Sequence, residues 1–105
     1  MNLTSYVQDR QLTITLTGEI DHHCAREIMK TVGEKIDLYL PLRCILDFRD
    51  VTFMDSSGIG LVLGRYRLMQ ELNGKLVLRA MPPHIRRVMR VAGIGSLEIE
   101  EESCV

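Results

Sequence analysis

Apolar and polar residues alternate near the start of the chain, and this period of two is typical of a half-exposed strand. The letters LTITL at 12–16 alternate in this way, and LTSYV at 3–7 can pair with them across the polar turn QDRQ. The short apolar run RCILDF at 43–48 instead indicates a strand buried on both faces. KLVLRAM at 75–81 predicts another strand, and SLEIE at 96–100 a last short one.

Between these strands, apolar residues recur at intervals of three and four, which is the period of an amphipathic helix. The first helical segment follows Asp21, a good N-cap, and stops at Pro41. The second ends at NG, residues 73–74, and the third opens at PP, residues 82–83, and closes at Gly93. The residues expected on the three buried faces are Ala25, Ile28, Met29, Val32 and Ile36; Ile59, Val62, Leu63, Tyr66 and Met69; and Ile85, Val88, Met89 and Ala92.

This order of elements, two strands followed by alternating helices and strands, predicts an α/β fold in one domain spanning residues 1–105. We expect a mixed, mainly parallel sheet with an N-terminal hairpin and crossover helices. In such sheets, ligands and partners meet the loops at the carboxyl ends of the strands. Two such loops stand out, GEIDHH at 18–23 and FMDSSG at 53–58.

Length and charge narrow the possibilities. A chain of 105 residues builds one modest core, and 13 basic against 14 acidic residues create no general field for nucleic acid or anionic lipid. Neither a membrane span nor a secretory signal is visible, so a cytoplasmic protein is expected. Cys24, Cys44 and Cys104 are odd in number and widely spaced, which indicates free thiols.

The segment FMDSSGIGLVLGRYR, residues 53–67, does not match the motif of a serine hydrolase or of a dinucleotide-binding site. A serine nucleophile elbow requires glycine two residues before the serine, and Met54 stands there. Gly58, Gly60 and Gly64 resemble a dinucleotide fingerprint, but the third glycine is one position late and the later acidic residue is absent. Gly60 and Gly64 are instead expected to permit close packing or the approach of a partner.

The sequence lacks a complete set of residues for a zinc site or for a phosphoaspartate site. DHHC at 21–24 contains zinc-ligand types, but four consecutive residues do not converge on one ion. A receiver-type domain needs an acidic pair and a lysine at a strand end, whereas Asp21 stands alone and Lys75 begins its strand. No metal or cofactor is therefore expected. The acidic segment 98–103 is interpreted as a solvated tail, and Arg86, Arg87 and Arg90 as a solvated helix face.

The serines at the start of the second helix can do more than cap it. A hydroxyl there sits among free backbone N–H groups at the positive end of the helix dipole, where a phosphate is stabilised. Asp55, Ser56 and Ser57 all suit the single N-cap position, and the surplus favours a function beyond capping. If Ser57 caps by accepting from the N–H of Gly60, Ser56 stays outside the helix and free for a kinase. A well-capped turn without further function is the alternative, and physics alone leaves Ser56 and Ser57 close.

Three motifs carry a family resemblance: LTGEIDHH at 16–23, the segment 53–67, and the P-x-x-R pattern followed by GI around the third helix. In this order and spacing, the chain resembles the anti-sigma factor antagonists, whose fold is the STAS domain. DHH and GRYR are especially similar to the sporulation branch of that family.

This resemblance implies a phosphorylation switch without catalysis by the chain itself. The unphosphorylated antagonist would bind an anti-sigma factor that is also a serine kinase, with ADP or ATP bound to that partner, and so free a sigma factor. The kinase would then phosphorylate Ser56, and a metal-dependent phosphatase would reset the switch. The resemblance implies partner contacts at Asp21, Asp55, Ser57, Ile59 and Gly60. The rival hypothesis is a STAS-like domain that binds a nucleotide or small ligand at the same loops.

Overall fold

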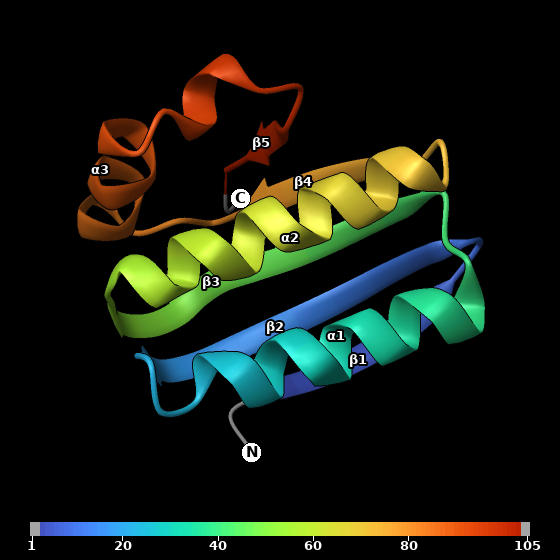
Figure 1. Cartoon of the computed structure of the whole chain (residues 1–105), viewed down its shortest axis with the longest axis horizontal. Helices are drawn as coiled ribbons and strands as arrows, with labels where there is room; N and C mark the ends of the chain where they lie inside the picture. The colour runs from blue at the N-terminus through green and yellow to red at the C-terminus, as the bar shows by residue number, and fades with distance from the viewer. Residues whose placement is uncertain (1–2, 104–105) are drawn as a thin grey trace.

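The computed structural model of the chain describes residues 3–103 (Figure 1). Five strands form one sheet in chain order, β1-β2-β3-β4-β5. β1 runs antiparallel to β2, whereas β2, β3, β4 and β5 run parallel to one another. The strands are β1 (Leu3–Gln8), β2 (Gln11–Ile20), β3 (Arg43–Met54), β4 (Lys75–Arg79) and β5 (Glu100–Glu102). The predicted mixed sheet with its N-terminal hairpin is confirmed.

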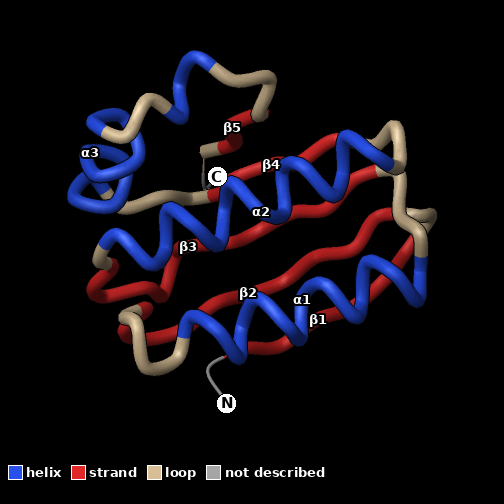
Figure 2. Tube along the Cα trace, viewed as in Figure 1, coloured by secondary structure: helices blue, strands red, loops and turns tan. Residues whose placement is uncertain are grey.

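The helices lie as crossover connections between the parallel strands. α1 (Ala25–Tyr39) and α2 (Ser56–Glu71) run side by side across one face of the sheet (Figures 1 and 2). α3 (Pro83–Val91) follows β4, and the short 3₁₀ helix η1 (Ile94–Ser96) leads into β5. Since each crossover returns the chain to the same end of the sheet, the carboxyl ends of β2, β3 and β4 share one edge.

The core lies between the sheet and α1 and α2, where alternate residues of the strands meet the apolar helix faces. Most predicted helix-face residues are buried or pack partly buried against this core. Leu61 is fully buried although the predicted face omitted it. Ala92 is exposed because α3 ends at Val91, so that prediction was wrong.

β2 departs from simple periodicity, whereas the turn before it follows the prediction. Thr13 is only 2% exposed, so β2 is not simply half-exposed. The predicted hairpin turn is confirmed at Asp9 and Arg10, whose positive φ angles of 52° and 62° match the right-handed twist of the flanking strands.

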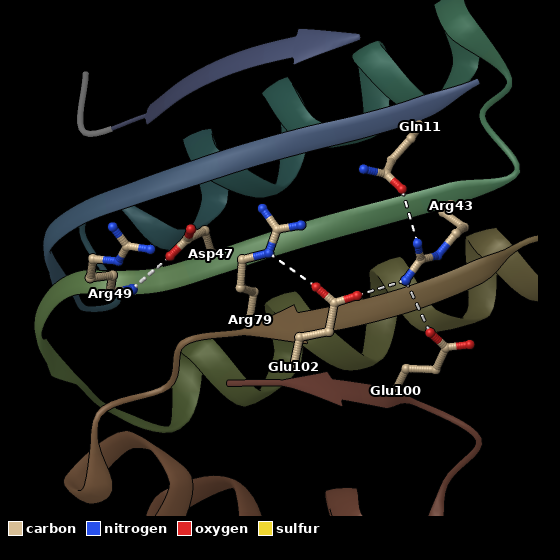
Figure 3. Close-up of polar contacts among 7 residues, drawn as sticks. All are labelled: Gln11, Arg43, Asp47, Arg49, Arg79, Glu100 and Glu102. Carbon is tan, nitrogen blue, oxygen red and sulfur yellow. Dashed lines mark hydrogen bonds and ion pairs between the residues drawn. The ribbon is translucent and has the colours of Figure 1, made fainter. Parts of the chain in front are cut away.

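The last strand comes later than predicted and consists of glutamates. Most of the acidic segment is exposed, as a solvated tail would be, but Glu100–Glu102 pair with β4, so the interpretation of this part as a tail was wrong. Glu102 reaches back over the open face of the sheet, where its two carboxylate oxygens pair with Arg43 at 2.8 Å and Arg79 at 3.2 Å (Figure 3). Arg43 also pairs with Glu100 at 3.2 Å and donates to Gln11 at 3.0 Å. These ion pairs add to the parallel backbone pairing of β5 with β4.

Candidate functional site

The two loops singled out in the sequence meet at one edge of the sheet. β2 and β3 pair in parallel as far as their last residues, Ile20 and Met54. The N–H of Asp55 then donates to the carbonyl of Ile20, with 3.2 Å between N and O. Asp21 and Asp55 therefore follow neighbouring strand ends, and the starts of α1 and α2 lie beside one another (Figure 1).

Asp55, and not Ser57, is the N-cap of α2. Its Oδ1 accepts a hydrogen bond from the N–H of Ser57 at 2.8 Å, and its carbonyl accepts from the N–H of Gly58 at 3.0 Å. Ser56 is the first residue of the helix. Of the three residues competent to cap, the structure selects Asp55, because its extended backbone aims its carboxylate at the free N–H groups. The condition under which Ser56 would stay outside the helix, a cap by Ser57, is not met.

The two serines differ in accessibility. Ser56 is exposed, whereas Ser57 is half-buried. Within residues 3–103, the Ser56 hydroxyl has no hydrogen-bond partner, so no internal contact holds it in the folded chain. Ser56 is therefore the more accessible of the two serines.

Asp21 organises the neighbouring loop. Its Oδ1 accepts from the N–H groups of His23 at 2.9 Å and Cys24 at 3.2 Å. Although desolvation opposes it, these hydrogen bonds hold the pKa of Asp21 below its ordinary value. α1 begins later than predicted, at Ala25, so Asp21 caps the turn that leads into the helix.

His22 joins the two loops. Its Nδ1 lies 4.0 Å from Oδ2 of Asp55, and its ring lies 4.0 Å from that of His23, centroid to centroid. The sequence placed both histidines in solvent, and both are exposed. The contact with Asp55 was missed because it depends on the register of β2 and β3 rather than on sequence spacing.

The first turns of α2 present a mixed surface. Ile59 is half-buried and Gly60 is exposed. Close packing within the chain occurs at Gly58, where an added Cβ would overlap Cγ and Sδ of Met54. It does not occur at Gly64, where an added Cβ would meet nothing within 4 Å, and at Gly60 it would make only an ordinary contact.

Phe53 is a surface residue of this edge that sequence reasoning did not single out. It is 48% exposed near the end of β3, two residues before Asp55. The alternation of side chains along β3 carries the signal, since Met54 is buried and its neighbour therefore faces away from the core.

The edge around Ser56 differs from a ligand-binding pocket. The larger cavity, of about 250 Å³, is lined by Tyr66, Asn73 and Lys75 at the opposite end of α2. Among residues 3–103, no group of three His, Cys, Asp or Glu side chains is arranged to hold a metal ion. No helix there is long and apolar enough to cross a membrane. The edge around Ser56 is an exposed surface that includes His22, His23 and Phe53.

Fold and site together define a small α/β module that presents an accessible serine at a helix start. The sequence model of the STAS domain matches residues 2–102, and the chain belongs to the STAS domain family. The predicted family is confirmed.

Among curated members of this family, the chain is similar to anti-sigma factor antagonists. The chain is 33% identical over 96 residues to an anti-sigma F factor antagonist of Lysinibacillus sphaericus, covering 90% of this chain and 82% of that protein. It is 31% identical over 83 residues to an anti-sigma F factor antagonist of Paenibacillus polymyxa, covering 79% of this chain and 71% of that protein. Both relatives are named anti-sigma F factor antagonists, which agrees with the family that the sequence motifs predict.

Two solved structures share the fold. The anti-sigma factor antagonist SpoIIAA in its unphosphorylated form has a TM-score of 0.85 at 31% identity, covering 98% of this chain and 88% of that one. The Bacillus cell fate determinant SpoIIAA in its phosphorylated form has a TM-score of 0.78 at 31% identity, covering 98% and 91%. The α/β architecture is therefore that of a known regulatory protein.

Proposed function

We propose that this chain is an anti-sigma factor antagonist that binds an anti-sigma factor with serine kinase activity and so releases a sigma factor, in a sporulation-type transcriptional switch. Phosphorylation of Ser56 by that kinase ends the complex. The observation that carries this proposal is the exposed Ser56 hydroxyl at the first position of α2, between the capping Asp55 and the half-buried Ser57. The names of the relatives support it.

The partner would contact both loops of this edge. Asp21 and Asp55 supply carboxylates, and both are positioned by hydrogen bonds from backbone N–H groups. Ile59 adds apolar surface, and Gly60 lets a partner approach the helix backbone. Ser57 lies at the border of this surface, half-buried beneath it.

Charge explains how phosphorylation ends binding. A phosphate adds roughly −1.5 to −2 charges beside Asp55. A dianion ~5 Å from one acidic group of the partner is repelled by about 1.6 kcal/mol in near-aqueous surroundings, which is roughly tenfold in affinity. The helix dipole stabilises the phosphate by only about 0.3 to 1 kcal/mol, so it eases the modification without neutralising the charge.

The switch requires no change of fold. SpoIIAA has been solved in both phosphorylation states, and the chain matches both with similar coverage. In our proposal the ADP or ATP is bound by the partner, a metal-dependent phosphatase resets the switch, and this chain supplies the substrate serine and no catalytic group.

A binding measurement with charge variants tests this proposal. The kinase of the same organism, loaded with ADP, is titrated into the wild-type chain, Ser56→Asp and the control Ser103→Asp, in which the same charge is added at an exposed residue after β5. We expect tight binding by the wild type and the control, and a four- to tenfold loss for Ser56→Asp at unchanged thermal stability. Equal binding by all three would exclude the charge mechanism, and absence of wild-type binding would exclude the function.

A further inference from the structure

Charge is unevenly distributed along this chain. Residues 72–97 contain no Asp or Glu and five basic residues, so the rest of the chain carries eight basic and fourteen acidic residues. The basic residues of this segment are Lys75, Arg79, Arg86, Arg87 and Arg90. A near-neutral total of −1 thus conceals one strongly basic region.

The arginines of α3 are not neutralised within the fold. Arg79 is paired with Glu102, but among residues 3–103 no carboxylate lies within 4.0 Å of Arg86, Arg87 or Arg90, and all three are exposed. Glu101 borders the same small cavity as Arg86 and Arg90, yet beyond ion-pair distance. The three charges therefore repel one another and contribute no ion pair that would stabilise α3.

α3 lies at the same end of the molecule as the switch serine. The ring Nε2 of His84 lies 3.1 Å from the carbonyl oxygen of Thr52, three residues before Asp55 on β3. α3 therefore lies against the end of β3, the strand that leads into α2. Arg87 and Val91, three and seven residues after His84, lie on the same side of the helix, and Val91 is 85% exposed. Arg86 and Arg90 lie on the other flank of the exposed helix face, beside the small cavity that Glu101 borders.

A stable protein interface is wide enough to include both the edge that carries Ser56 and the arginines of α3. A standard interface covers about 800 Å² on each partner, which is a patch roughly 30 Å across. The whole molecule measures only 30 × 29 × 26 Å. A protein that covers Ser56 and the exposed Phe53 is therefore large enough to reach the neighbouring face of α3 as well.

We propose that Arg86, Arg87 and Arg90 form a docking surface for an acidic surface of the same anti-sigma factor kinase, an inference that rests on the function proposed above. Arginine suits this role because its planar guanidinium binds carboxylates through two parallel hydrogen bonds. Charges at the rim of an interface act mainly on the association rate and its salt dependence. Duplex DNA fits less well, because the remainder of the chain carries fourteen acidic against eight basic residues and would repel the phosphates.

The test compares two variants that lose the same charge in different places. Association rates with the ADP-loaded kinase are measured at low and high salt for the wild type and for Arg86→Gln/Arg87→Gln/Arg90→Gln. The control, Arg10→Gln/Arg67→Gln/Lys75→Gln, removes three exposed charges away from α3. We expect the α3 variant to associate about tenfold more slowly at low salt with a shallower salt dependence, and the control to stay within about twofold of the wild type.

Each other outcome overturns the inference in a recognisable way. If the wild type binds and the α3 variant keeps its rate and salt dependence, the docking surface is excluded while the proposed function stands. An equal loss in the control variant means that only net charge matters. If the wild type binds a 20-base-pair duplex or phosphatidylserine vesicles and the α3 variant does not, with unchanged kinase binding, the surface serves another class of partner. If the wild type does not bind the kinase at all, the proposed function fails first.

Discussion

The carboxylate of Asp55 accepts a hydrogen bond from the backbone N–H of Ser57, with 2.8 Å between Oδ1 and N. This bond starts α2 directly after Asp55, so Ser56 occupies the first helical position. The serine that is exposed and the aspartate that fixes its backbone are thus consecutive residues. Substitution of Asp55 therefore tests the cap of α2, and substitution of Ser56 tests the proposed phosphorylation.

Substitution of Asp55 should separate the cap from its charge. Asp55→Ala removes the acceptor for the Ser57 N–H, and we expect a loss of about 1 kcal/mol in the free energy of unfolding. Asp55→Asn keeps a side-chain oxygen at the N-cap and should stay close to the wild type. Urea denaturation of the three proteins gives the comparison. Equal stability of all three would mean that the hydrogen bond does not hold the start of α2.

The glycines of α2 should respond in opposite directions to the same substitution. Gly58→Ala places a Cβ against Cγ and Sδ of buried Met54, and such overpacking typically costs 1–3 kcal/mol. Gly64→Ala meets nothing within 4 Å and should gain up to about 1 kcal/mol from the higher helix propensity of alanine. Thermal unfolding of the two variants tests this, and a stabilising Gly58→Ala would contradict the packing.

The ion pairs of β5 should make stability depend on pH in the acid range. The hydrogen bond from Arg43, assisted by Arg79, lowers the pKa of Glu102 below its usual value of 4.5. A carboxylate with a lowered pKa in the folded state stabilises the fold above about pH 4.5, and this contribution is lost as the pH falls through the folded-state value. Glu102→Gln should therefore lose less stability than the wild type between pH 6 and pH 3.

The matched control for that measurement is Glu71→Gln, an exposed carboxylate that forms no ion pair with the described residues. It should retain the acid sensitivity of the wild type. The account of β5 is contradicted if Glu102→Gln and Glu71→Gln have the same pH dependence of unfolding, measured by urea titration at each pH.

The two described cysteines should differ sharply in reactivity. Burial raises the pKa of the Cys44 thiol to about 12, with the charge of Arg65 opposing it, and the thiolate is the reactive form. Cys24 is half-buried at the loop of Asp21. In a Cys104→Ser background, since Cys104 lies outside the described residues, a maleimide should label Cys24 well before Cys44. Rapid labelling of Cys44 in the folded chain would contradict its burial.

Most of the architecture follows from periodicity and punctuation. Alternation in β2, the apolar run in β3, and the helix-breaking NG and PP pairs define the order of elements, because each reflects a local backbone preference. The exception was β5, whose residues are all glutamate. The sequence predicted this last strand at 96–100. Its ion pairs with Arg43 and Arg79 join residues that are distant in the sequence, and a local pattern does not report such pairs.

The site was predictable in composition but not in geometry. The sequence brought Asp21, Asp55 and Ser56 to one edge of the sheet because they follow strands that run parallel. It did not decide which residue caps α2, since Asp55 and both serines are chemically competent and only the backbone angles at Asp55 select it. The contact between His22 and Asp55 required the register of two strands.

Mass spectrometry identifies directly which serine the kinase phosphorylates. The wild type, Ser56→Ala and Ser57→Ala are incubated with the kinase and ATP, and the modified residue is mapped by fragmentation. We predict one phosphate on Ser56 in the wild type and in Ser57→Ala, and none in Ser56→Ala. Phosphate that persists in Ser56→Ala and vanishes in Ser57→Ala would contradict the account.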